Sequence, residues 1–146
     1  MPSKRRAFTL LELVVVLAIM ALVLTVTVPS VGALYDRQLV EQQARVLEQD
    51  LMWLRSEAQR SGKSTTFERK ASGYTLTVET TEGSQVQRKT LVSGRVKLSA
   101  NSLSGEITFA PRGTAFEKCT LTVRVGKQAR TVIVSNLGRV RVGVPV

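Results

Sequence analysis

Residues 8–28 read FTLLELVVVLAIMALVLTVTV, and no other part of the chain says as much about its architecture. The segment has 21 residues with a single charge, Glu12, and as a helix rising 1.5 Å per residue it would cover a hydrocarbon core of about 30 Å. Three cations at positions 4–6 precede the segment and none lies inside it, so the positive-inside rule places the amino terminus in the cytoplasm. The sequence therefore predicts one transmembrane helix over 8–28, with everything after Pro29 across the membrane.

A secretory signal peptide is the simpler alternative, because it also combines a basic start with an apolar core of about 7 to 15 residues. Here the apolar run is longer, and it ends at Val28-Pro29 without a small-residue cleavage site. It also carries Glu12, whose ionised carboxylate costs about 2.5 kcal/mol or more in hydrocarbon. Glu12 is therefore predicted to be functional and to pair with a cation. The nearest candidate is an amino group made by cutting the chain just before the helix.

Composition limits the chemistry that the chain can perform. Its 146 residues suit one small domain with one extra element, and 43% apolar with 22% charged residues exclude a disordered chain or a multi-span membrane protein. Histidine is absent and Cys119 is the only cysteine, which excludes zinc sites built from several Cys and His ligands, Ser-His-Asp catalysis and Cys-His catalysis. We expect Cys119 to be a small buried residue, with a reactive thiol as the alternative. No carboxylate pair or glycine-rich phosphate loop stands out, so the sequence predicts no enzyme, cofactor, metal or small-molecule substrate.

Beyond Pro29, apolar residues recur at intervals of three and four, which is the pattern of one helix face. They are Val40, Ala44, Leu47, Leu51, Leu54 and Ala58. The helix is predicted to continue over 29–61 and to end at Ser61-Gly62, with a break or kink at Pro29 because proline removes a backbone donor. Trp53 lies off the apolar face. We expect it to pack under a sheet, with a partner-facing aromatic as the alternative.

After Gly62 the sequence changes to short segments rich in Thr and Val, which predict strands. These segments are 65–68, 74–79, 86–91, 96–98, 107–109, 120–125, 131–134 and 140–142. Glycine-containing turns between them suit antiparallel meanders. The predicted fold class is therefore α+β: a long N-terminal helix packed on an antiparallel β-sheet domain over residues 62–146.

Basic residues are concentrated near the carboxyl end. Without the three cations at 4–6, the net charge of +10 falls to +7, and residues 95–146, with nine basic and two acidic residues, carry all of it. Arg139 and Arg141 alternate with valines on the last strand, so their guanidiniums point the same way, about 7 Å apart. Such a pair could grip successive DNA phosphates. A solvated basic face and an acidic protein partner are the alternatives.

The sequence KRRAFTLLELVVVLAI, residues 4–19, resembles the processing site of type IV prepilins and type II secretion pseudopilins. The resemblance implies that a prepilin peptidase removes a leader, residues 1–7, by cutting between Ala7 and Phe8, and that it methylates the new amine of Phe8. It also implies that Glu12 pairs with the amine of a neighbouring subunit during assembly, and that Pro29 kinks the helix. The family usually has glycine where this chain has Ala7, and alanine is small enough to fit.

Residues 107–113, ITFAPRG, and 132–142, VIVSNLGRVRV, are similar to the H-type pseudopilin and FimT-like minor pilin group. The resemblance implies a minor pseudopilin of a type II secretion system, anchored once in the bacterial inner membrane with its C-terminal domain in the periplasm. It would assemble with other pseudopilins into a short filament that drives secretion. The alternative is a FimT-like minor pilin that binds DNA for natural transformation through Gly138, Arg139 and Arg141, because Gly-Arg-x-Arg segments in that group are associated with DNA binding.

Overall fold

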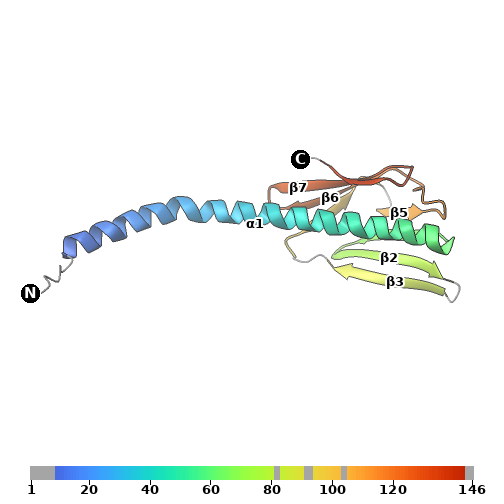
Figure 1. Cartoon of the computed structure of the whole chain (residues 1–146), viewed down its shortest axis with the longest axis horizontal. Coiled ribbons are helices and arrows are strands. Elements are labelled where there is room, and N and C mark those ends of the chain that lie inside the picture. The colour runs from blue at the N-terminus through green and yellow to red at the C-terminus, as the bar shows by residue number, and fades with distance from the viewer. Residues whose placement is uncertain (1–8, 81–82, 91–93, 103–104, 144–146) are drawn as a thin grey trace, which may run out of the picture. The chain divides into compact units, whose positions relative to one another are not determined.

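The computed structural model describes residues 9–80, 83–90, 94–102 and 105–143, without the side chains of 26–31, 80 and 87–90. One helix, α1 (Leu10–Ser61), is followed by strands β1 to β8 (Figure 1). The chain divides into two compact units, Met1–Tyr35 and Asp36–Val146, and α1 contributes to both. The helix continues through position 29 as predicted. The break that was the alternative at Pro29 is wrong, because α1 is one continuous helix through this position, while the kink stays a prediction.

The strands fall close to the predicted segments, with ends that differ by at most three residues. They are β1 (Thr65–Lys70), β2 (Gly73–Thr80), β3 (Gly83–Thr90), β4 (Lys97–Ala100), β5 (Glu106–Phe109), β6 (Cys119–Val125), β7 (Gln128–Val134) and β8 (Val140–Val142). All of their pairings are antiparallel. This confirms the α+β fold class, a long N-terminal helix with an antiparallel β domain.

The strands form two sheets rather than one continuous meander. The first sheet has the order β3-β2-β1-β5 and the second has the order β4-β6-β7-β8. The expected meanders hold for β1 to β3 and for β6 to β8. Between them the chain passes from β3 to β4 in the second sheet, returns to β5 in the first, and enters the second again at β6. These crossovers bring Ile107 of β5 beside Phe67 of β1.

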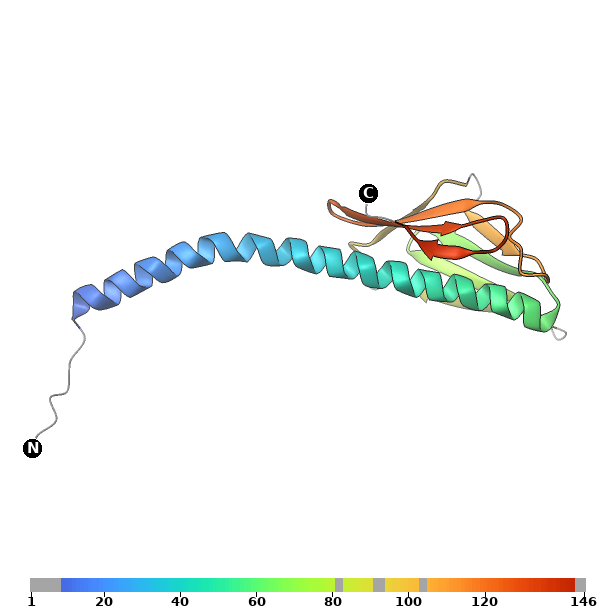
Figure 2. The same cartoon turned by 45° about the horizontal axis from the view of Figure 1, so that its top comes forward.

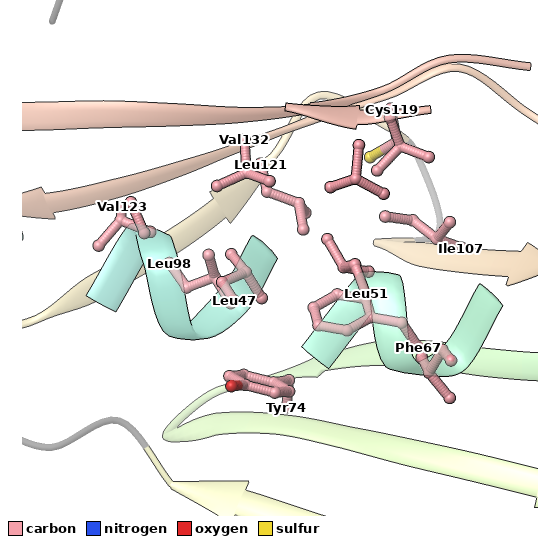
Figure 3. Close-up of a cluster of buried hydrophobic side chains, with 14 of the residues drawn as sticks. Leu47, Leu51, Phe67, Tyr74, Leu98, Ile107, Cys119, Leu121, Val123 and Val132 are labelled. Atoms are coloured by element: carbon pink, nitrogen blue, oxygen red, sulfur yellow. The ribbon is translucent and has the colours of Figure 1, made fainter. Parts of the chain in front are cut away.

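A single core joins the two sheets to the part of α1 in the second unit. The six apolar positions of the predicted helix face are all buried, and Leu51, Leu54, Ala44 and Ala58 are fully so. Figures 1 and 2 show this part of α1 alongside both sheets. In Figure 3, Leu47 and Leu51 lie among side chains of the first sheet, such as Phe67, and of the second, such as Leu121. The helix is thus the element on which both sheets bury their inner faces, and burial of apolar area is the main stabilising term.

A glycine ends the helix, and one polar side chain is paired within the core. Gly62 ends α1 in a left-handed conformation, with φ of 67°, and its N–H donates to the Ala58 oxygen over 3.1 Å, as the predicted helix end requires. Tyr74 is buried beneath the helix, and its hydroxyl donates a 2.6 Å hydrogen bond to Asp50 Oδ2 on α1. Burial, together with this bond to a carboxylate, raises the pKa of Tyr74 well above its usual value.

Two side-chain expectations have different outcomes. Cys119 is fully buried, which confirms that it is a small core residue. Trp53 is 39% exposed, so the expectation that it packs under a sheet is wrong. Its position explains the difference: two residues from Leu51, at about 100° per residue, Trp53 lies on the side of α1 away from the core.

Candidate functional site

The N-terminal candidate residues lie where α1 begins. Thr9 precedes the helix, and its hydroxyl oxygen accepts a 3.2 Å hydrogen bond from the backbone N–H of Glu12. The sequence Thr-Leu-Leu-Glu over 9–12 therefore acts as a helix cap, a role that sequence analysis missed although the Ser/Thr-x-x-Glu spacing signals it. Glu12 is exposed in the first turn, where the helix dipole favours a carboxylate. Ala7 and Phe8, the predicted cleavage and methylation positions, lie outside the described residues.

The helix of the first unit exposes its apolar side chains on every side. Large apolar residues from Leu10 to Leu24 are between 47% and 83% exposed, and Glu12 is the charged residue among them. Such a surface is unfavourable in water and calls for an apolar environment or partner helices. Within the part of the chain that the structure describes, no helix meets the length and apolarity needed to cross a membrane.

The C-terminal candidate residues lie at β8, the edge strand of the second sheet. Val140 is buried while Arg139 and Arg141 are exposed, so the alternation predicted from the sequence is confirmed. Both arginines line a hollow of about 440 Å³. Lys118, which the sequence analysis did not single out, lines the same hollow. Lys118 directly precedes β6, and β6 begins opposite the end of β7, which brings this lysine beside the 135–139 turn.

Gly138 closes this turn and packs it against the rest of the domain. It is buried with φ of 74°, and its N–H donates to the Ser135 oxygen over 2.8 Å. A Cβ at position 138 would lie 1.8 Å from the carbonyl oxygen of Gly113. That same oxygen accepts a 3.0 Å hydrogen bond from Arg55 Nε of α1. Gly138 therefore lets the turn pack against the Gly113 loop and the helix, which fixes the position of Arg139.

The charge of residues 95–146 is partly neutralised by α1. Arg95 lies 2.8 Å from Asp36, and Arg130, whose side chain is 20% exposed, lies 2.7 Å from Glu41. Both acids belong to the helix, in a part of the sequence with no net charge of its own. The C-terminal third is therefore not a uniformly basic surface, and the cations around β8 form a smaller cluster within it. No group of three or more potential metal-ligating side chains occurs in the described ranges.

Three features together define the type IV pilin-like class of protein. They are a long N-terminal helix, an apolar start of that helix with one cap and one carboxylate, and a small β domain packed on the helix. Comparison with known families identifies the leader motif: residues 2–28 match the prokaryotic N-terminal methylation motif. Residues 43–138 match the family described as Type II transport protein GspH, and the chain belongs to this family. None of the curated protein sequences matches the chain significantly.

Solved structures agree with the class. The type IV minor pilin FimU of Pseudomonas aeruginosa is similar with a TM-score of 0.61 and 16% identity, over 73% of this chain and 90% of that chain. The minor pseudopilin EpsH from the type 2 secretion system of Vibrio cholerae is similar with a TM-score of 0.60 and 18% identity, over 70% of this chain and 94% of that chain. The protein is thus a type IV pilin-like minor pseudopilin or pilin. Its leader motif indicates processing by a prepilin peptidase, filament assembly and membrane anchoring through the N-terminal helix.

Proposed function

We propose that this chain is a minor pseudopilin of a type II secretion system, assembled into a short envelope-spanning pseudopilus that drives protein secretion. The observation that carries the proposal is the match of residues 43–138 to a family of type II transport proteins, in a chain whose residues 2–28 match the N-terminal methylation motif. Prepilin peptidase removes residues 1–7 by cutting between Ala7 and Phe8, and Phe8 becomes N-methylated. Residues 8–28 then anchor the mature chain in the inner membrane, with the 62–146 domain in the periplasm.

Glu12 has the central role in this assembly. It is the one charged residue among exposed apolar side chains at the start of α1. In lipid, an unpaired carboxylate is unfavourable by about 2.5 kcal/mol or more, and pairing with the methylated amine of a neighbouring Phe8 offsets that penalty. The pair would fix the register between subunits as well as stabilise them. Pro29 kinks the helix beyond this contact.

Replacing Glu12 with glutamine tests the assembly role, because it removes the charge while keeping the shape and the backbone cap from Thr9. We expect the leader to be cleaved normally and incorporation into filaments to fall at least about tenfold, the factor that corresponds to roughly 1.4 kcal/mol. Glu79→Gln, at an exposed position on β2, is the matched control. Incorporation of the Glu12→Gln chain at the parental level would contradict the pairing.

A deletion strain distinguishes the secretion system from a pilus. We expect loss of secreted proteins from the medium when the gene is deleted, restored by the parental chain and not by Glu12→Gln. A strain that secretes normally but no longer takes up DNA would assign the chain to a pilus instead.

The second candidate function is DNA binding by a minor pilin, and the exposed pair Arg139 and Arg141 favours it. The test is duplex DNA binding by the full chain in a non-ionic detergent across a salt series, beside Arg139→Ala/Arg141→Ala. If the chain serves DNA uptake, binding persists at physiological salt, and the double variant loses most of it with a salt slope shallower by about two. Arg124→Ala/Lys127→Ala, at exposed positions near the β6–β7 turn, controls for general charge. Equal behaviour of the two double variants would rule this function out.

A further inference from the structure

The segment Phe116-Glu117-Lys118 separates two hollows of opposite charge on the β domain. The basic hollow, of about 440 Å³, is lined by Lys118, Arg139 and Arg141 with Leu137 and Ile133. The acidic hollow, of about 280 Å³, is lined by Glu106 and Glu117 with Phe116, Ile107 and Thr108. The two hollows are neighbours because they border the same segment: Glu117 and Lys118 are consecutive, and the backbone just before them bonds to Thr108 of β5 and to Asn136 of the 135–138 turn.

Each hollow carries one large apolar side chain that the domain leaves uncovered. Phe116 in the acidic hollow is 69% exposed and Leu137 in the basic hollow is 76% exposed. Elsewhere in the second unit, β-domain side chains of this size are mostly buried in the core. Exposed apolar residues bordered by charges are typical of a protein interaction surface.

Backbone hydrogen bonds hold the main chain between the two hollows in place. The N–H of Phe116 donates to the Thr108 oxygen over 3.1 Å, and the N–H of Ala115 donates to the Asn136 oxygen over 3.0 Å. The 115–118 segment is therefore tied to β5 on one side and to the 135–138 turn on the other. A surface that is already ordered loses little conformational entropy when a partner docks.

The charges specify the occupant. A nucleic acid would be attracted by the basic hollow but repelled by Glu106 and Glu117 beside it, and a purely acidic peptide would meet the same repulsion. A partner that fits both hollows has an acidic region, a basic region and apolar groups between them. The surface around the two hollows of this chain is itself of that kind. We propose that a second copy of the chain docks here through a two-fold contact, with the acidic hollow of each copy against the basic hollow of the other.

The two-fold arrangement follows from the adjacency of the hollows. A two-fold axis that lies in the contact plane and passes between the hollows brings the acidic hollow of one copy against the basic hollow of the other. Both charge contacts then form at once, and Phe116 of one copy meets Leu137 of the other at the centre. Like-charge contacts would arise in a parallel arrangement and are unfavourable. This contact is made by the β domain alone. It covers Arg139 and Arg141, so it competes with the DNA binding that forms the second candidate function.

Two variants of single charge sign test the proposal in the full chain in non-ionic detergent. The basic-only variant is Glu106→Lys/Glu117→Lys, and the acidic-only variant is Lys118→Glu/Arg139→Glu/Arg141→Glu. Association is followed by energy transfer between donor-labelled and acceptor-labelled chains. We expect the parental chain to pair, each variant alone to pair about tenfold more weakly or less, and an equal mixture of the two variants to pair at least as well as the parent.

The mixing experiment isolates this surface from other contacts. Association through the N-terminal helix would persist in each variant alone and would overturn the proposal. A mixture that fails to pair would also overturn it, as would a parental chain that stays monomeric and binds duplex DNA more tightly once the acids are replaced. Arg124→Glu/Lys127→Glu, at exposed positions outside both hollows, should pair as the parent does. Growth of the parental complex beyond two copies would contradict the two-fold geometry.

Discussion

Replacing Gly138 with alanine tests the close approach that holds the last turn of the chain against α1. An added Cβ would lie 1.8 Å from the Gly113 oxygen and 3.2 Å from Arg55 Nε, so the backbone at one of the two glycines has to move. The positive φ of 74° adds about 1 kcal/mol for a residue with a side chain, and overpacking adds about 1–3 kcal/mol. Displacing the Gly113 oxygen also weakens its bond from Arg55, worth about 1 kcal/mol. The expected destabilisation is about 3–5 kcal/mol, a large share of the stability of a small domain.

Thermal unfolding of the full chain in detergent, followed by the fluorescence of Trp53, measures this loss. For a domain of this size, we expect the midpoint to fall by about 12–20 °C in Gly138→Ala. Gly62→Ala is the matched control, because Gly62 also has a positive φ, of 67°, but nothing lies within 4 Å of the position of its Cβ. It should lose only about 4 °C. A Gly138→Ala midpoint within a few degrees of the Gly62→Ala midpoint would refute the steric reasoning.

Two further predictions concern the core. Burial and the bond to Asp50 raise the pKa of Tyr74, so the folded chain holds this proton more tightly than the unfolded chain; the resulting stability is fully present below about pH 10 and is lost as the pH rises further. Tyr74→Phe should remove this dependence and lower stability at neutral pH by about 1–3 kcal/mol, while Tyr35→Phe, at an exposed position, should change neither. Urea unfolding at several pH values checks both, and parallel pH curves for the parent and Tyr74→Phe would contradict the assignment. Leu51→Ala, at a fully buried position, should lower the free energy of unfolding by about 2–5 kcal/mol in the same assay. Met52→Ala, at a position that is 48% exposed, should lower it by less than about 1 kcal/mol. Similar losses for the two variants would show that α1 does not carry the core as described.

The elements of the β domain were predictable because their signals are local. Alternation of Thr and Val marks strands such as β6, and glycines such as Gly126 mark the turns between them, whatever the rest of the chain does. The sheet to which a strand belongs is not local. β4 and β5 are both short, four-residue strands, and what separates them is pairing with strands distant in the sequence: β4 pairs with β6, and β5 pairs with β1.

Trp53 shows how residue type can mislead when period is the better guide. Large aromatic residues are usually buried, which favoured a position under a sheet. The helical period pointed elsewhere: Leu47, Leu51 and Leu54 already fill the inner face of α1, and position 53 falls on the opposite side. Geometry along the helix therefore decided the position of Trp53, and the size of its side chain did not.

The charge of the C-terminal third required the folded structure for a different reason. Counting along the sequence gives this third the whole net charge of the chain after position 7, yet a partner meets surfaces rather than segments. Folding places Asp36 and Glu41 of α1 against two of its arginines. It also gathers Lys118 with Arg139 and Arg141 around one hollow, and Glu117 with Glu106 around the other. Long-range contacts thus sort the charges of this segment into a basic and an acidic hollow, which a count along the sequence does not show. If that surface governs recognition, association should depend on where its acids and bases lie rather than on its net charge. A variant whose acids and bases are exchanged, with the net charge unchanged, should then still pair with copies of itself.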